Sequence, residues 1–291
     1  MRARAVFLLM ILMFFSVFSV KTYFSEAADQ SCREGMPTSF FGSEILRFAV
    51  SVFALTDTAE TDLFTRWVNS ESKTSVELGL SARTKGIAFV LSGGLRQEHR
   101  SWAIERPDKK LPGISRFVTT RYELFQEGGL NPQTTIFEAD YEARKLRRIR
   151  RLPSLIGTEE VISEWTIPEG VFYEDPLVVL FNIRQGRRHL VMGEEAIIKT
   201  FPFDGDNDPY DIIRIYRGFN EENPALFLVS APSGFLRSDR RILVKVWFDK
   251  ATITPLRAVA EKVVPMPFPF SDGDASGSLV CFGDTIHPEI K

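Results

Sequence analysis

Three aspartates alternate along a short polar segment, and they are the clearest candidates for metal chemistry in this sequence. Asp204, Asp206 and Asp208 lie in DGDNDPYD, residues 204–211. Alternating carboxylates are typical of loops that bind Ca²⁺. The sixth position is Pro209, however, where such a loop needs glycine for its sharp turn, and no glutamate stands at the twelfth. We therefore expect an acidic turn between two strands, with no metal and no other cofactor.

Arrangements that would indicate catalysis are weak. His99, His189 and His287 are too scattered to place two zinc ligands on one helix face, and no Gly-x-Ser-x-Gly motif occurs. Acids flank aromatic residues between positions 164 and 175, as in a sugar-binding cleft, but acids in a loop before a helix are commoner. We predict that the protein is not an enzyme. A hydrolase of envelope polymers is the less favoured alternative.

The basic run KLRRIRR, residues 145–151, raises the question of nucleic acid. The chain has 36 Lys and Arg against 38 Asp and Glu, a net charge of −2. We expect these arginines to pair across strands with Glu138, Asp140 or Glu142 instead. The predicted partner is therefore not a nucleic acid.

The first 27 residues predict export. A basic start, MRAR, precedes an apolar run at residues 5–20, and SEA at 25–27 places small residues where a signal peptidase cleaves. We expect a signal peptide at residues 1–27 and a single periplasmic domain at 28–291. The alternative is an uncleaved membrane anchor, because the apolar run approaches the roughly 17–25 residues of a membrane span.

The chain has two cysteines, Cys32 and Cys281, near the two ends of the expected mature protein. A disulfide can persist in an oxidising compartment such as the periplasm. Sequence separation does not show whether the two Cα atoms lie within about 7 Å, as a bridge requires. A disulfide and two unpaired thiols both remain open.

Short segments of alternating character predict a mostly β protein. In residues 44–55, Leu46, Phe48 and Val50 fall on one face and Arg47 falls on the other. Gly- and Pro-containing segments separate many further stretches of strand length. Such a series predicts an antiparallel sheet that curls or closes into a barrel, because an open sheet would expose long edges. The further strands are expected at 61–69, 74–82, 115–125, 134–141, 241–248 and 255–264, with weaker candidates at 85–91, 97–105, 195–201, 210–218 and 225–231.

One segment, EDPLVVLFNIRQG at residues 174–186, departs from the β pattern. An aspartate followed by proline is typical of a helix start, and Gly186 is placed to end the helix. Because little of this segment is polar, a helix at about 175–185 should be covered nearly all round. We expect a large antiparallel sheet or barrel wrapped around it. The residues assigned to this structural helix are Asp175, Pro176, Leu177, Leu180 and Phe181.

Three segments resemble a family of bacterial periplasmic domains of unknown function. Residues 42–63 resemble its Gly-Glu-x-Leu strand and the strand that follows, residues 174–184 its Asp-Pro-Leu segment, and residues 244–262 its Trp-x-x-Asp and proline strand pair. The resemblance implies a secreted, barrel-like antiparallel β domain, similar in architecture to periplasmic lipoprotein carriers. It implies no activity.

Composition suggests what such a domain would do. The chain contains 25 phenylalanines, which can line an apolar cavity as readily as they fill a core, and barrels often hold a small ligand. Our hypothesis is an exported, non-enzymatic envelope protein that binds an apolar small molecule or lipid inside the barrel. The alternative is a structural or scaffold protein that acts through protein contacts in envelope assembly.

Overall fold

The computed structural model describes most of the expected domain. The described residues belong to one compact unit, residues 37–291. They are residues 44–52, 55–70, 73–91, 93–107, 114–128, 132–154, 157–188, 190–203, 207–218, 225–232, 242–250, 254–264 and 273–284.

Several sequence predictions fall outside this description. The expected signal peptide at residues 1–27, Cys32, His189, Asp204, Asp206 and His287 lie outside the described residues. Cys281 is described only through its backbone, so a disulfide and two unpaired thiols both stay open. Among the described residues, no helix is both long and apolar enough to cross a bilayer.

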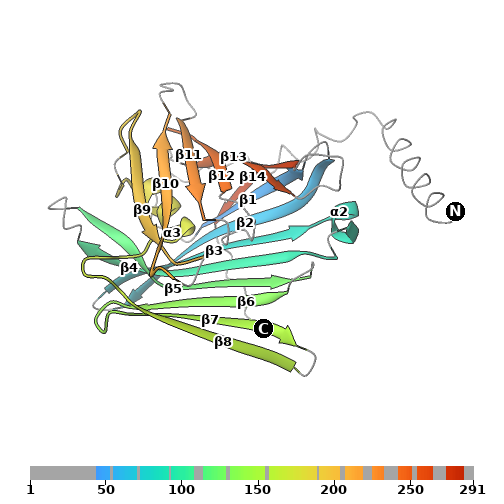
Figure 1. The fold of residues 1–291 in the computed structure, drawn as a ribbon. Coiled ribbons are helices and arrows are strands. Elements are labelled where there is room, and N and C mark those ends of the chain that lie inside the picture. The colour runs from blue at the N-terminus through green and yellow to red at the C-terminus, as the bar shows by residue number, and fades with distance from the viewer. Residues whose placement is uncertain are drawn as a thin grey trace, which may run out of the picture. The chain divides into compact units, whose positions relative to one another are not determined.

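The described strands form one antiparallel sheet of 14 strands (Figure 1). They are β1 (Glu44–Val52), β2 (Leu55–Ser70), β3 (Lys73–Thr84), β4 (Arg96–Pro107), β5 (Ser115–Glu127), β6 (Gln133–Asp140), β7 (Lys145–Ser154), β8 (Gly157–Thr166), β9 (Glu195–Thr200), β10 (Asp211–Arg217), β11 (Ala225–Ala231), β12 (Ile242–Phe248), β13 (Pro255–Val264) and β14 (Gly273–Asp284). Strands adjacent in sequence pair with each other from β1 to β8 and from β9 to β14, and β1 pairs with β14.

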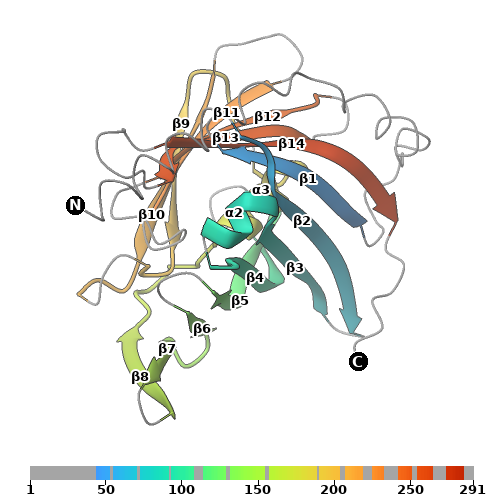
Figure 2. The same cartoon turned by 90° about the vertical axis from the view of Figure 1, so that its right-hand side faces the viewer.

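The sheet curls without closing. Its edges are β8 and β9, and no strand in the described part of the chain pairs with the outer side of either. These two edge strands are consecutive in sequence, and the helix α3 (Pro176–Arg184) lies between them in the chain. Figure 2 shows β1–β5 and β9–β14 curving around α3, while β6–β8 extend away from it. The predicted fold class, a large antiparallel curled sheet around a short apolar helix, is confirmed.

The helix begins and ends as the sequence predicted. Asp175 caps it, because one carboxylate oxygen accepts hydrogen bonds from the backbone N–H groups of Leu177 (2.8 Å) and Val178 (3.3 Å). Pro176 occupies the first turn, where a backbone N–H would have no partner within the helix, so the missing N–H of proline costs no hydrogen bond. After the C-cap, Gly186 has a φ of 63°, the left-handed conformation that favours glycine.

The helix packs against both halves of the sheet. Leu177, Val178 and Phe181 contact a buried cluster on β1–β5, and Val179 and Ile183 contact a second cluster on β9–β12. Leu180 is only partly buried and packs against both clusters. The prediction that the helix is covered nearly all round is confirmed. Leu180, which was expected to be among its covered residues, is however less buried than Leu177 and Phe181.

Three strands and one helix differ from the sequence prediction. Residues 85–91 were expected to form a strand, but Gly86–Leu91 form a short helix, α2. No strand was assigned to β7, β8 or β14, although the arginines of β7 were expected to pair across strands. β7 is the KLRRIRR segment, and its charges hid the alternation of Leu146 and Ile149 onto opposite faces of a strand that pairs on both sides. β14 is rich in glycine and serine, which disfavour strands in isolation.

The arginines of β7 do pair across strands, although with other partners than expected. Arg151 forms an ion pair of 3.0 Å with Glu160 of β8, and Lys145 forms one of 2.9 Å with Glu164. Glu138 pairs with Arg121 of β5 at 2.9 Å. Lys145, Arg147 and Arg151 are therefore part of a charged ladder on the outer face of β5–β8, whereas Arg148 is buried on the opposite face, which it shares with Leu146.

Candidate ligand-binding face

The inner face of the sheet is the face that α3 covers, and the strand register identifies its side chains. Leu46 of β1 lies opposite Leu63 of β2, which lies opposite Leu80 of β3. All three pack in the cluster that contacts α3. Because side chains alternate across a strand, residues two positions apart share a face. The inner face of these strands therefore continues to Phe48, Val50, Thr61, Ala59 and Ala82.

Burial decreases along the inner face with distance from α3. Leu46, Leu63 and Leu78 are 0%, 7% and 2% exposed. Towards the other end of the same strands, the inner residues whose side chains the structure describes are only partly buried. These residues are Phe48 and Val50 on β1, Thr61 and Ala59 on β2, and Leu80 and Ala82 on β3.

The second half of the sheet shows the same change. Phe227 and Phe248 are buried against α3. Further along, the inner residues Val229, Val244 and Ala258 are partly buried, although Ala231 at the end of β11 is only 4% exposed. Val246 lies opposite Ala258, Ala258 opposite Gly277, and Gly277 opposite Val50, so the two halves form one continuous inner surface. We name the partly buried apolar part of it the open inner face: Phe48, Val50, Ala59, Leu80, Ala82, Val229, Val244, Val246, Ala258 and Ala260.

The open inner face comprises the apolar members of this surface, and the polar Thr61 lies among them, opposite Phe48 and Ala82. Its members are aliphatic apart from Phe48, and four of them are alanines, which have short side chains. The nearest polar pair is Gln97 and Gln126, in which Gln97 Nε2 donates a hydrogen bond of 3.0 Å to Gln126 Oε1. Since none of the residues that define this face is ionisable, the face suits an apolar ligand better than acid–base chemistry.

The acidic residues before α3 are structural supports. Asp175 is fully buried, and its second carboxylate oxygen accepts hydrogen bonds from Ser101 Oγ (2.5 Å) and Thr119 Oγ1 (2.7 Å). Burial raises the pKa of this carboxyl, although these hydrogen bonds act in the opposite direction. The neighbouring Glu174 is 1% exposed and accepts a hydrogen bond of 2.9 Å from Asn182 of the helix.

The remaining acids of that segment do not complete a cleft. Glu174 is also paired with Arg188 (2.5 Å) and Arg116 (3.4 Å). Glu164 lies on the outer side of β8, and Glu169 is exposed in the loop that follows. Two of the four acids are thus buried and two are exposed, so the arrangement expected of a sugar-binding cleft is not formed.

Of the candidate metal and histidine residues, only Asp208 and His99 belong to the described part of the chain. Asp208 is exposed in the turn before β10. His99 is buried on the inner face, where its Nδ1 lies 2.6 Å from the hydroxyl of Tyr122. Within the described ranges, no group of three His, Cys, Asp or Glu residues is placed to hold a metal ion.

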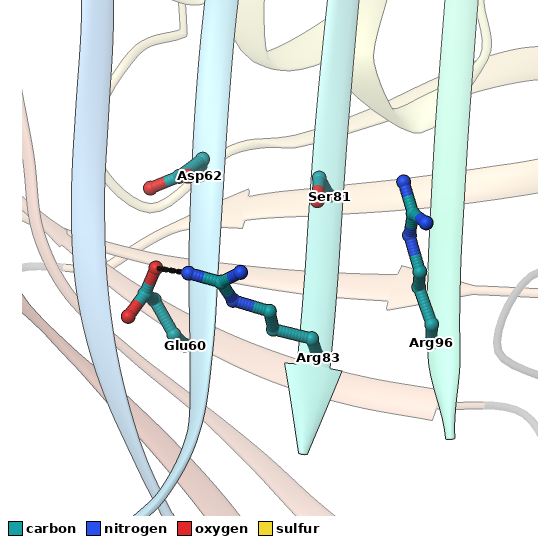
Figure 3. Close-up of a pocket in the computed structure, with 5 residues that line it drawn as sticks. All are labelled: Glu60, Asp62, Ser81, Arg83 and Arg96. Carbon is teal, nitrogen blue, oxygen red and sulfur yellow. Dashed lines mark hydrogen bonds and ion pairs between the residues drawn. The ribbon is translucent and has the colours of Figure 1, made fainter. Parts of the chain in front are cut away.

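A small pocket on the outer face is highly charged (Figure 3). Glu60 forms ion pairs with Lys85 (2.5 Å) and Arg83 (2.7 Å). The hydrogen bond from Lys85, helped by Arg83, lowers the pKa of Glu60 to about 2. We interpret this pocket as a solvated charge ladder. Its lining residues are Glu60, Asp62, Ser81, Arg83 and Arg96.

Comparison with known proteins adds little. No family model matches the sequence, and a search of curated proteins finds no match. A solved structure, the β-barrel-like protein of domain of unknown function DUF1849 from Brucella abortus, aligns with 84% of this chain and 97% of its own. The identity is 9% and the TM-score is 0.39. A likeness this low supports no conclusion about function.

The open inner face was not predicted from sequence, although a signal for it exists. Its alanines alternate with polar or charged residues in strands, as at Ala82 beside Arg83 and Ala258 beside Arg257. Alternation predicts which face each alanine shares with its neighbours. It does not show where along the strand a helix stops covering that face, because this depends on where α3 docks.

Proposed function

We propose that the protein is a non-enzymatic binding protein that holds a long apolar ligand, such as a lipid chain, against the open inner face. One observation carries this proposal: most inner side chains near α3 are buried, whereas most of those further along the strands are only partly buried. The exceptions are Trp67, partly buried beside Phe181 of α3, and Ala231, buried at the far end of β11. Apolar surface left accessible inside a curled sheet costs free energy until something covers it. A ligand that covers it stabilises the folded protein.

The chemistry of this face favours a large apolar ligand. Each methylene taken from water contributes about 0.8 kcal/mol, so a chain of roughly 15 methylenes gains on the order of 12 kcal/mol. Association itself costs about 4–15 kcal/mol. A short chain would gain too little, so the expected ligand is a long acyl chain or an apolar molecule of similar area.

We further propose that the chain is exported to the periplasm through residues 1–27 and is related to the periplasmic domains that it resembles. The support for export is the basic, apolar and small-residue order of that segment. The support for the relationship is that the three motif segments coincide with β1 and β2, with α3, and with β12 and β13.

A scaffold function is the second candidate, and the edge strand β8 favours it. Ile136, Ile149 and Ile162 form one row across β6–β8, and Ile162 at the edge is 45% exposed. An edge strand of this length can pair with another chain. Glu160 and Glu164 flank Ile162 on the same face, however, and charges at an edge oppose pairing.

Native mass spectrometry of protein purified from the periplasm tests the proposed function. We expect a fraction of the protein to carry a co-purified apolar molecule that organic extraction removes. The extracted protein should then bind the apolar fluorescent probe N-phenyl-1-naphthylamine in a saturable manner, with the added lipid extract as competitor. Absence of both co-purified ligand and saturable probe binding would contradict the proposal.

A further inference from the structure

We propose that α2 is a membrane-docking tip through which the ligand passes between a bilayer and the open inner face. This inference rests on the proposed function, because it assigns the source of the ligand. Two apolar side chains of this six-residue helix are more than half exposed: Val90 is 74% exposed, and Phe89 is 54% exposed with one side of its ring against Gly94. Exposed large apolar residues that adjoin each other are typical of interaction sites.

The tip is held in a fixed position at the end of β2 and β3. Lys85 N, just before α2, donates a hydrogen bond of 2.7 Å to the carbonyl of Thr58, and Thr84 N donates one of 3.1 Å to that of Leu95. Gly94 N closes the turn after the helix on the carbonyl of Phe89 (2.7 Å). The exposure of Phe89 and Val90 is therefore a property of an anchored hairpin.

Glycines are required at this anchor. Gly93, Gly94 and Gly128 all have φ near 70°, a conformation that favours glycine. A Cβ atom on Gly128 would lie 2.5 Å from the carbonyl oxygen of Gly94, so the turn after α2 rests directly on the end of β5. The close backbone packing fixes where the apolar tip points.

The tip lies at the same end of the sheet as the open inner face. Figure 1 shows α2 beyond the ends of β2 and β3, and Figure 2 shows it at the opening of the curled sheet. Thr58, which accepts the hydrogen bond from Lys85, also donates a hydrogen bond from its hydroxyl to the carbonyl of Val50 (3.1 Å). Val50 belongs to the open inner face, so apolar surface at the tip and inside the sheet lies on adjoining segments.

The size of the tip favours a bilayer over a protein partner. A stable protein interface buries about 800 Å² on each partner, far more than Phe89 and Val90 offer. Insertion of two apolar side chains between lipid headgroups requires no shaped partner and is reversible. The nearby cations are already paired, Lys85 and Arg83 with Glu60 and Arg96 with Glu98. Apolar insertion should therefore dominate over attraction to anionic lipid.

Vesicle binding of the whole mature chain tests this. Vesicles of phosphatidylethanolamine and phosphatidylglycerol are sedimented with wild-type protein, with the double variant Phe89→Ser/Val90→Ser, and with Ile197→Ser as matched control. Ile197 is 58% exposed on β9, on a different part of the sheet. We expect the double variant to lose bound protein by roughly tenfold and the control to match wild type. In addition, tryptophan fluorescence of Phe89→Trp should be quenched by brominated acyl chains.

The results separate this inference from the proposed function. Probe binding without vesicles should be the same in wild type and in Phe89→Ser/Val90→Ser, which also shows that the variant is folded. Equal vesicle binding by wild type and double variant would overturn the docking tip, as would an equal loss in Ile197→Ser. Loss of binding when phosphatidylglycerol alone is omitted would also overturn it, because charge would then be the cause.

Discussion

Ser101 on β4 donates a hydrogen bond of 2.5 Å to the carboxylate of Asp175, which caps a helix 74 positions later in the chain. This bond fixes the N-terminus of α3 to the inner face of the sheet. Asp175 also satisfies Thr119 Oγ1 and two backbone N–H groups, all of them buried. One carboxylate thus joins two strands to the helix that they enclose.

Removal of the Asp175 carboxylate should strongly destabilise the folded protein. Asp175→Ala leaves four buried donors without an acceptor, and we expect a loss of about 3–5 kcal/mol in the free energy of unfolding. Asp208→Ala, in an exposed turn, should cost less than about 0.5 kcal/mol. Denaturant unfolding of both variants measures this difference. Equal stability of the two variants would contradict the role assigned to Asp175.

The covered helix predicts a contrast between two apolar positions. Val178 is 0% exposed at the centre of the packing against β1–β5, so Val178→Asp should bury an uncompensated carboxyl and cost several kcal/mol. The matched variant Ile197→Asp changes an exposed residue of an outer face and should cost less than about 1 kcal/mol. Thermal unfolding of the two variants, each compared with wild type, measures this difference in stability. A small effect at Val178 would show that the helix is not enclosed.

Gly79 packs beneath the ring of Phe64, so the effect of a substitution at Gly79 should depend on that ring. Phe64 on β2 lies opposite Gly79 on β3, and a Cβ on Gly79 would come within 1.9 Å of the ring. Gly79→Ala should therefore displace the ring and cost about 1–2 kcal/mol. In a Phe64→Ala background the same change should cost much less, because the clash is gone. A double-mutant cycle measures this coupling, and additive effects would contradict it.

The charge ladder beside α2 predicts a pH dependence. Lys85 and Arg83 lower the pKa of Glu60 from 4.5 to about 2 in the folded protein. The folded state therefore binds this proton less readily than the unfolded state, and Glu60 stabilises the protein above pH 4.5. Its contribution falls as the pH falls from 4.5 towards 2. The difference in stability between wild type and Glu60→Gln should shrink over that range, and a constant difference would contradict the shifted pKa.

Local sequence signals predicted the parts of the fold that depend on local chemistry. The start of α3 was recognisable because Asp175 and Pro176 are suited to a cap and a first turn, and most strands were recognisable from alternation. The helix α2 was not, since its apolar residues are equally compatible with a strand. The turn that follows it contacts Gly128, and this contact between residues 34 positions apart has no local sequence signal.

The candidate site was less accessible to sequence reasoning. A curled sheet around a helix predicted an apolar interior, but helical spacing selected Leu180 as a buried residue, and it is only partly buried between the two halves of the sheet. The extent of the open inner face depends on the position of α3 relative to the strands. That position is set by long-range contacts such as Ser101 with Asp175.

The most direct test of the central claim is probe binding by two tryptophan variants on adjacent positions of β3. Ala82 belongs to the open inner face, whereas Ser81 lines the charged pocket on the outer face. If the inner face holds an apolar ligand, Ala82→Trp should fill the space and weaken binding of N-phenyl-1-naphthylamine by roughly tenfold, with little change in stability. Ser81→Trp should bind the probe as wild type does. Wild-type probe affinity in folded Ala82→Trp would contradict the account.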